Sequence, residues 1–139
     1  MSQPIFEHRF RVALHDTDAA GVLFFAHLFR HAHDAYEVWI AALGFPLDAM
    51  LREGGLRLPI VHAEADYRRP LRHGDTVTVH LAVAELGDSA FTLDYRFIDA
   101  TGALAASARS VHVGIDRSGD RALPEMLRQT LLRPVLRRA

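Results

Sequence analysis

The sequence contains neither cysteine nor lysine. The lack of cysteine excludes disulfide bonds, thiolate ligands for a metal and a cysteine nucleophile, and it predicts a cytoplasmic location. All 16 basic residues are therefore arginines, and the formal net charge of −1 leaves no basic excess for binding nucleic acid. The sequence also lacks an apolar run long enough to span a membrane, and residues 1–11 are too polar for a secretory signal. We expect no nucleic-acid partner and no membrane partner.

The rest of the composition is typical of a globular chain. Half of the 139 residues are hydrophobic and 24% are charged, which argues against an intrinsically disordered segment. A chain of this length can bury a hydrophobic core of its own. Because no internal repeat or linker is visible, the sequence predicts a single domain over residues 1–139.

The longest regular segment expected from the sequence is a helix over residues 25–43. Its apolar residues recur at steps of three and four, which is the period of one helical face. These residues are Phe25, Leu28, Phe29, Ala32, Ala35, Tyr36, Trp39, Ile40 and Leu43. Gly44 and Pro46 provide the stop signal. Val38, Ala41 and Ala42 widen the apolar stripe, so we expect the helix to be covered on most sides.

Strand patterns lie on both sides of this helix. Five strands are expected, over residues 5–14, 58–71, 76–86, 91–99 and 104–116. Short turns separate the last four, so we expect them to form consecutive antiparallel hairpins. A short helix over residues 45–53 and a weak helix over residues 123–138 complete the pattern. The fold class is therefore α+β, an antiparallel sheet curved around a long central helix, with one sheet face left for self-association.

Two carboxylates, Asp16 and Asp18, precede the long helix. In an extended segment they would share a face and raise each other's pKa, whereas the helix N-terminus favours their ionised forms. A carboxylate beside the first helical amides could act on a carbonyl group. Two other interpretations stay open. The aspartates could form a helix cap or an Asx turn, or they could bind a divalent metal beside a nucleotide diphosphate, although no phosphate-binding glycine loop accompanies them.

Histidines and arginines supply further candidates. His27, His31 and Asp34 share one helical face, where they could hold a metal or form a polar seam. His62 lies near the start of an expected strand and could face a pocket or the core. Three arginines end that strand, where they could bind an anionic ligand tail or be solvated edge charges. They are Arg68, Arg69 and Arg72.

The residues before the long helix resemble a known signature. The run Asp16-Thr17-Asp18-Ala19-Ala20-Gly21-Val22, followed by an aromatic pair, is similar to the motif of the 4-hydroxybenzoyl-CoA thioesterase family of hotdog-fold proteins. Residues 58–63 and 69–75 match the second strand and the following turn of that family. Within the family, the chain looks most like the 1,4-dihydroxy-2-naphthoyl-CoA thioesterases, which share Ala35-Tyr36-Glu37 in the helix. The resemblance spans residues 10–115.

The resemblance implies a hotdog fold, assembly as a homodimer or homotetramer, and hydrolysis of an acyl-CoA substrate with no cofactor and no metal. The family's catalytic aspartate corresponds to Asp18, which acts as a nucleophile or as a general base on water. A backbone N–H at the helix start, at Phe25 or Ala26, is expected to hold the thioester carbonyl. The other expected substrate contacts come from Gly21, His27, His62, Arg69 and Arg72.

Two positions depart from the family pattern. Some relatives carry His or Tyr where this chain has Phe25, so only a backbone role is left at that position. Relatives carry Asn, Gln or Ser where this chain has His27. A hotdog dehydratase would need a catalytic histidine near a Pro-Gly turn, and this chain has Asp-Ala-Ala-Gly instead.

Thioester hydrolysis requires an attacking oxygen, a hydrogen-bond donor for the developing oxyanion and a pocket that shields the acyl group from bulk water. Asp18, the first helical amides and the aromatic helix face could each supply one of these. We therefore expect a thioesterase that acts on an aromatic acyl-CoA. The alternatives are a short-chain aliphatic acyl-CoA thioesterase and a non-catalytic acyl-CoA-binding hotdog protein.

Overall fold

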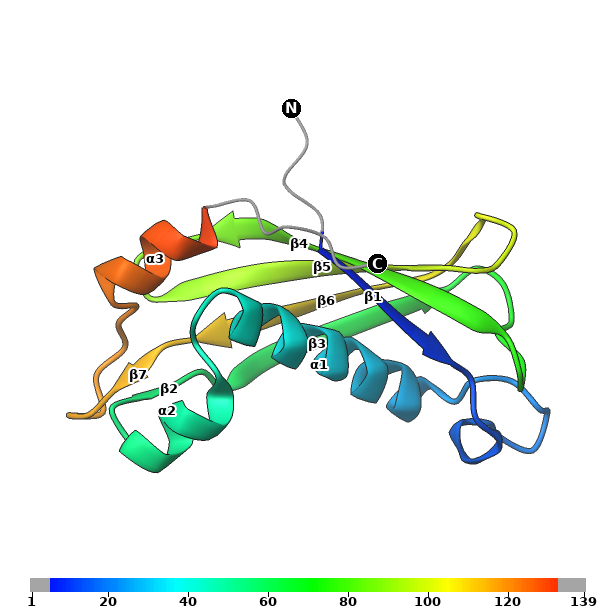
Figure 1. Cartoon of the computed structure of the whole chain (residues 1–139), viewed down its shortest axis with the longest axis horizontal. Coiled ribbons are helices and arrows are strands. Elements are labelled where there is room, and N and C mark those ends of the chain that lie inside the picture. The colour runs from blue at the N-terminus through cyan, green and yellow to red at the C-terminus, as the bar shows by residue number, and fades with distance from the viewer. Residues whose placement is uncertain (1–5, 133–139) are drawn as a thin grey trace.

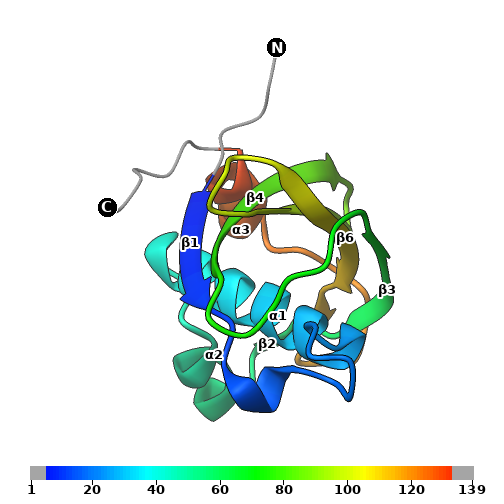
Figure 2. The ribbon, with the colours of Figure 1, turned by 90° about the vertical axis from the view of Figure 1, so that its right-hand side faces the viewer.

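A curved antiparallel sheet and one long helix dominate the structure, a computed structural model that describes residues 6–132 (Figure 1). The long helix, α1 (Phe25–Ala42), lies in the concave side of the sheet, and the end-on view shows the strands arching around it (Figure 2). A 3-10 turn, η1 (Leu14–Asp16), precedes α1, and two short helices, α2 (Leu47–Glu53) and α3 (Glu125–Leu131), lie near its far end. The expected α+β architecture is confirmed.

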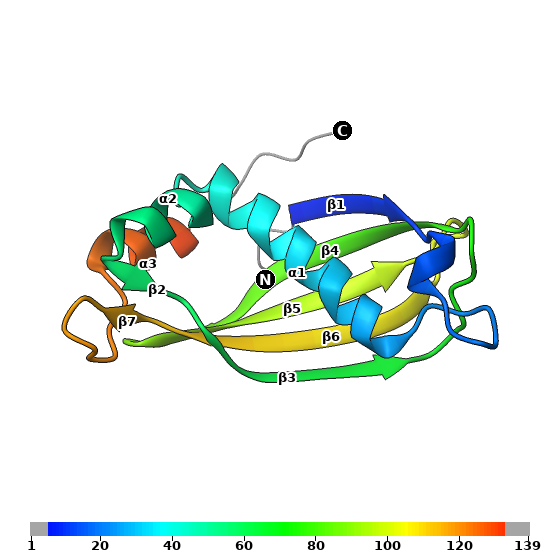
Figure 3. The same cartoon turned by 90° about the horizontal axis from the view of Figure 1, so that it is seen from below.

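The five long strands are ordered β1-β4-β5-β6-β3, and every neighbouring pair is antiparallel (Figure 3). Their bounds are Phe6–Arg11 for β1, Ile60–Tyr67 for β3, Thr76–Leu86 for β4, Ala90–Ile98 for β5 and Leu104–Val113 for β6. Two short strands, β2 (Leu56–Arg57) and β7 (Ile115–Asp116), pair with each other in a separate sheet. The edges of the main sheet are therefore β1 and β3.

One of the expected hairpins is wrong, because β3 does not pair with β4. Strand β3 pairs with β6, and β4 lies between β1 and β5. Residues 68–75 instead cross from the β3 edge to β4, passing the start of α1, where the Leu71 carbonyl accepts a hydrogen bond from the Leu23 N–H (2.7 Å). The turn at Arg72–Asp75 does form, but a turn alone does not determine which strand is the neighbour.

Helix α1 buries one face against the sheet. Its buried residues are Leu28, His31, Ala32, Ala35, Tyr36, Trp39 and Ile40, which follow the predicted helical period. The expectation that the helix is covered on most sides is wrong for the single chain, because Val38, Ala41 and Ala42 are exposed. The apolar stripe in the sequence is wider than the buried face because Ala41 and Ala42 lie beside that face, and such small side chains can be exposed to solvent at little cost.

The concave face of the sheet supplies the other half of the core. Alternate residues of β4 and β5 are buried there: Val77, Val79, Leu81, Phe91, Leu93, Tyr95 and Phe97. Strand β6 departs from this apolar pattern, because Ser110 and His112 face Leu93 and Phe91 across the ladder. Ser110 Oγ lies 2.8 Å from the Tyr95 hydroxyl and 2.8 Å from His112 Nε2. These buried polar groups hydrogen-bond to one another, whereas the other ring nitrogen of His112, Nδ1, has no hydrogen-bond partner within residues 6–132.

Element boundaries differ from the expectations at several ends. The strand expected over residues 58–71 is shorter, and the one over residues 104–116 is divided into β6 and β7. Helix α3 begins at Glu125, and residue 5 and residues 133–138 of the expected elements lie outside the described residues. None of the helices within residues 6–132 is long and apolar enough to cross a membrane.

Candidate active site

Asp18 lies in a tight turn between η1 and α1. Its Oδ1 accepts hydrogen bonds from the N–H groups of Ala20 (2.8 Å) and Val22 (3.3 Å). The Gly21 N–H donates to the Asp18 carbonyl (3.0 Å), and Gly21 has a φ of 79°, a conformation that strongly favours glycine. The Asx turn that the sequence left open is therefore present. No hydrogen bond within residues 6–132 uses the second oxygen, Oδ2.

A pocket of about 460 Å³ opens beside this turn. Its walls come from the loop before α1, the first residue of α1, the end of β3 and the crossing segment. The lining residues are Asp18, Val22, Leu23, Phe24, Phe25, Tyr67, Arg68, Arg69 and Pro70. The volume lies in the range of small-molecule sites, and the lining is mostly apolar with a few polar groups, as in such sites. Three predicted site residues, Asp18, Phe25 and Arg69, therefore meet at one pocket.

The start of α1 offers unpaired amides at this pocket. Phe24 is the N-cap residue and supplies no side-chain cap. The N–H groups of His27 and Leu28 donate to the Phe24 carbonyl (2.9 Å each). Among the hydrogen bonds of residues 6–132, none comes from the N–H of Phe25 or Ala26 to a protein acceptor, because the first helical turn has no intrahelical partner for them. These two amides can therefore receive an oxyanion.

Tyr67 is a pocket residue that sequence reasoning missed. It ends β3, and its hydroxyl donates to the Leu23 carbonyl (2.6 Å). Burial, and then the Asp18 carboxylate, raise the pKa of the Tyr67 hydroxyl, which therefore remains a donor at neutral pH. Strand alternation places Tyr67 on the same face as Ala63 and Ala65, and that periodicity was the available signal. Its contact with Leu23 depends on the crossing segment and has no local signal.

Asp16 and Asp18 occupy different environments, and the expected rise of the Asp16 pKa is wrong. Asp16 is buried and 1% exposed, whereas Asp18 is exposed. Burial by itself would raise the Asp16 pKa, but the Ala13 N–H, His31 and Arg30 together lower it to about 2. Thr17 between them is extended (φ −97°, ψ 157°), but Asp16 ends the 3-10 turn η1 and Asp18 begins the Asx turn, and only the Asp16 carboxylate contacts Arg30 and His31.

The helical face of His27, His31 and Asp34 does not form a metal site. His31 is buried, and its Nε2 lies 3.0 Å from Asp16 Oδ2. Its Nδ1 lies 3.9 Å from Asp34 Oδ2. Within residues 6–132, no three His, Cys, Asp or Glu side chains gather as ligands for a metal. The polar-seam interpretation therefore describes this face.

The remaining predicted substrate contacts lie outside the pocket wall. Ala26 and His27 are in the first turn of α1, and the His27 ring centroid is 6.1 Å from that of Phe24. Arg72 pairs with Val22 through an isolated bridge, next to the pocket. His62 is exposed on β3, where its Nε2 lies 2.9 Å from Oε1 of Glu64. Roles in substrate binding for these residues and for Gly21 stay predictions.

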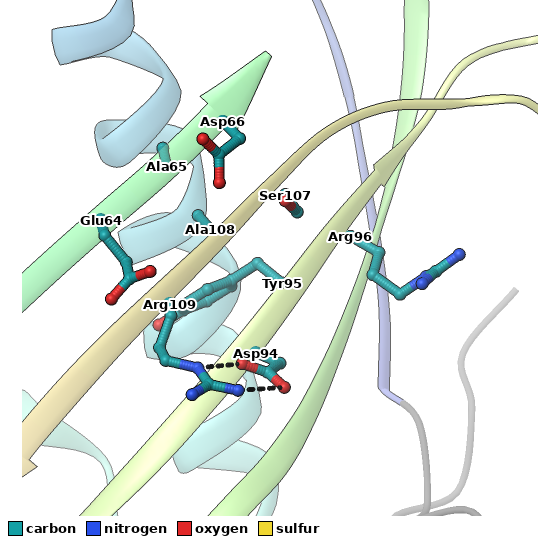
Figure 4. Close-up of a pocket in the computed structure, with 9 residues that line it drawn as sticks. All are labelled: Glu64, Ala65, Asp66, Asp94, Tyr95, Arg96, Ser107, Ala108 and Arg109. Carbon is teal, nitrogen blue, oxygen red and sulfur yellow. Dashed lines mark hydrogen bonds and ion pairs between the residues drawn. The ribbon is translucent and has the colours of Figure 1, made fainter. Parts of the chain in front are cut away.

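A second cavity, of about 280 Å³, lies on the face of the sheet opposite α1 and contains none of the predicted site residues (Figure 4). Its charged residues come from three neighbouring strands, and within residues 6–132 one ion pair joins two of them, Arg109 and Asp94. Arg109 donates through Nε (2.7 Å) and Nη2 (3.1 Å) to the Asp94 carboxylate. Arg96 points away from Glu64 and Asp66 (Figure 4). These charged side chains are mostly exposed, so the cavity is a feature of the outer surface of the sheet.

Comparison with known proteins identifies the family of the chain. Residues 12–135 match the profile of the thioesterase-like superfamily. The chain is 42% identical over 119 residues to a 1,4-dihydroxy-2-naphthoyl-CoA hydrolase from Synechococcus elongatus, covering 84% of this chain and 87% of the relative. The crystal structure of a 1,4-dihydroxy-2-naphthoyl-CoA thioesterase from Synechocystis is similar with a TM-score of 0.85 at 31% identity, covering 91% of this chain and 95% of that one. A gentisyl-coenzyme A thioesterase gives a TM-score of 0.81 at 29% identity, covering 90% and 98%. The chain therefore belongs to the thioesterase-like superfamily, with its hotdog fold and its thioester-hydrolysing chemistry.

Proposed function

We propose that the protein hydrolyses an aromatic acyl-CoA thioester of the 1,4-dihydroxy-2-naphthoyl-CoA or 4-hydroxybenzoyl-CoA type. One observation carries the proposal: Asp18 and Phe25, the expected sources of the attacking oxygen and the oxyanion donor, border the same pocket. The apolar walls of that pocket suit an aromatic acyl group. Relatives named for 1,4-dihydroxy-2-naphthoyl-CoA and gentisyl-CoA, both aromatic acyl thioesters, support the same substrate class.

In the proposed reaction Asp18 supplies the attacking oxygen, either its own or that of a water molecule that it deprotonates. The Ala20 and Val22 amides hold Oδ1, so Oδ2 is the oxygen available for reaction. The oxyanion that forms on the thioester carbonyl is stabilised by the N–H of Phe25 or Ala26. The CoA thiolate then leaves without a strong general acid, because thiols are far more acidic than alcohols or amines. If Asp18 is the nucleophile, the acyl group is left on Asp18 as a mixed anhydride, and water hydrolyses this anhydride to the free acid and the regenerated carboxylate.

The CoA moiety carries several negative charges, and arginines stand at the pocket. Arg68 and Arg69 both line it, and no ion pair involving either residue is found within residues 6–132. Their guanidinium groups are suited to phosphate recognition. We assign the CoA phosphates to this side of the pocket, with Arg72 close by on the crossing segment.

The edge strand β3 supports assembly as a homodimer, which can pair further into a homotetramer. β3 pairs with β6 on one side only, and its residues Ile60 and Val61 are 42% and 55% exposed. An uncovered apolar edge favours pairing with another strand. The Asp18 pocket lies at the Tyr67 end of β3. In an antiparallel pair of β3 strands, the pocket of one copy would therefore lie beside the Ile60 end of β3 in the other copy. There, a second apolar cavity of about 420 Å³ includes Leu58 and Pro59.

The test is release of CoA from 1,4-dihydroxy-2-naphthoyl-CoA, followed with a thiol reagent. We expect Asp18→Asn to lower turnover by at least about a hundredfold, the low end for loss of an acid–base group. Asp48→Asn, which alters an exposed aspartate on α2, is the matched control and should leave turnover unchanged. Near-wild-type CoA release by the Asp18→Asn variant would contradict the assignment.

A substrate panel separates the proposed activity from its alternatives. An aromatic acyl-CoA thioesterase should release CoA faster from dihydroxynaphthoyl-CoA and 4-hydroxybenzoyl-CoA than from acetyl-CoA or butyryl-CoA. The reverse order would indicate a short-chain aliphatic thioesterase. Binding of acyl-CoA without any thiol release would indicate a non-catalytic binding protein.

A further inference from the structure

The loop that carries Asp18 contains a second carboxylate, Asp16, whose two oxygens are both fully engaged. Its Oδ1 accepts a hydrogen bond from Nη2 of Arg30. Its Oδ2 accepts from the N–H of Ala13 (2.9 Å) and lies 3.0 Å from Nε2 of His31. Arg30 and His31 are on the second turn of α1. The side chain of Asp16 therefore fastens the loop to the body of the helix.

The charge states within this cluster follow from its contacts. Asp16 is ionised at neutral pH, because its neighbours hold its pKa near 2, and an ionised carboxylate only accepts hydrogen bonds. His31 Nε2 must therefore carry a proton and donate it to Asp16. Burial lowers the pKa of His31, so its ring is neutral at that pH and Nδ1 has no proton. Phe10 stacks on this ring, with centroids 3.7 Å apart and an interplanar angle of 8°. The stacking holds the ring so that the Nε2–H of His31 points at Asp16.

The main chain of Asp16 fastens the other side of the loop. Its carbonyl accepts a hydrogen bond from the N–H of Phe24 (3.0 Å), the N-cap residue of α1. Next to this hydrogen bond, Thr17 and Leu23 pair as a single antiparallel β-bridge. The turn that holds Asp18 is thus clamped at its base by a single residue, which binds the N-cap through its backbone and the second helical turn through its side chain.

We propose that Asp16, held by His31 and Arg30, is a positioning residue that sets the location of the Asp18 carboxylate relative to the first amides of α1. This inference rests on the proposed function of Asp18. Within residues 6–132, the hydrogen bonds to the Asp18 side chain come only from its own turn, from Ala20 and Val22. The placement of that turn against the helix therefore depends on the clamp at its base. Misplacement of a reacting group by about 1 Å can cost roughly a hundredfold in rate.

The decisive variants change the clamp and leave the pocket wall intact. Asp16→Asn removes the charge that binds Arg30 and His31. His31→Gln places an amide donor near the position of Nε2, whereas His31→Asn is too short to reach it, and both lose the stacking with Phe10. We expect Asp16→Asn and His31→Asn to lower kcat by about tenfold or more with KM changed by less than about threefold, and His31→Gln to recover most of kcat.

Asp34→Asn is the matched control. Asp34 lies 3.4 Å from Arg30 Nη1 and 3.9 Å from His31 Nδ1, but no hydrogen bond within residues 6–132 joins it to the loop. We expect its kcat to equal that of the wild type. A residue that acted only through stability would lower the folded fraction of both His31 variants alike, because the two share the loss of stacking.

A second readout does not require activity. Amide hydrogen exchange at residues 17–24 should be faster in Asp16→Asn and His31→Asn than in the wild type, and unchanged in Asp34→Asn. The wild type could hydrolyse no aromatic thioester and still show the expected differences in exchange at residues 17–24. That result would contradict the proposed function but would support the role of Asp16 in holding the loop. Unchanged exchange at residues 17–24 in Asp16→Asn, or equal kcat in His31→Gln and His31→Asn, would overturn the positioning role.

Discussion

The Tyr67 hydroxyl donates a hydrogen bond of 2.6 Å to the Leu23 carbonyl, and so joins the end of edge strand β3 to the residues just before α1. Leu23 is 1% exposed, and its N–H donates to the Leu71 carbonyl. Its main chain is therefore held from both sides by segments far away in the sequence. Because Tyr67 and Leu23 both border the Asp18 pocket, this bond fixes the width of the pocket between strand and helix.

We predict that Tyr67→Phe weakens both the fold and the site. The substitution keeps the ring but removes the donor from this part-buried hydrogen bond, which costs about 0.5–1.5 kcal/mol. Urea unfolding should show this loss, and kcat/KM for aromatic CoA thioesters should fall several-fold as the pocket wall relaxes. Unchanged stability together with unchanged kcat/KM would mean that the hydrogen bond has no role in either.

The oxyanion role of the backbone can be tested at Phe25. Proline is tolerated at the first position of a helix, and Phe24 already has the extended conformation (ψ 142°) that a following proline requires. Phe25→Pro removes only the N–H and the ring, and Phe25→Ala removes only the ring. If the Phe25 N–H stabilises the oxyanion, kcat should be about 10²–10³-fold lower in Phe25→Pro than in Phe25→Ala. Equal kcat values would show that the oxyanion donor is not the Phe25 N–H but the Ala26 N–H or another group.

The buried histidines make stability depend on pH. Burial lowers the His112 pKa to about 4 from an ordinary value of 6.5, so the unfolded chain binds the proton more strongly than the folded chain does. The stability is complete above pH 6.5 and is lost as the pH falls from 6.5 towards 4, by roughly 2–3 kcal/mol for this residue. His8 and His31 shift in the same direction.

Urea unfolding at pH 7.5 and pH 4.5 measures this loss, and His112→Gln is the comparison. Glutamine keeps a polar partner for Ser110 Oγ, which lies 2.8 Å from His112 Nε2, but it does not titrate. The variant should lose less stability than the wild type over the same pH interval. An equal loss in the two proteins would show that His112 does not contribute to the pH dependence.

Dimer formation along β3 can be tested with a charge on its exposed edge. Val61→Arg places a long charged side chain where the proposed partner strand would lie, and charged side chains on an edge strand oppose pairing with another strand. Light scattering after size exclusion should show the wild type as a dimer or tetramer and the variant as a smaller species. Met126→Arg, at an apolar residue of α3 that is 73% exposed, is the control and should leave the assembly unchanged.

Much of the architecture could be predicted from local patterns. The period of three and four residues identified α1 to within one residue of its observed end, and the alternation in β4 and β5 identified the side chains of the core. These predictions succeed because burial of an apolar face repeats with the geometry of the element itself. The pairing of β3 with β6 was not predictable in this way, because alternation does not specify which strand becomes the neighbour.

The sequence by itself determined the chemistry available to this protein: no thiol, two carboxylates and a glycine, and the start of a long helix within a few residues of them. Those features are local, and a turn or a helix end has the same hydrogen-bonding needs in any fold. Only the tertiary structure decided that Asp16 is buried against His31 while Asp18 borders a pocket, and that Tyr67 and Arg69 complete that pocket. Burial and long-range contact depend on how the crossing segment and β3 pack against α1, and no short stretch of sequence contains that information.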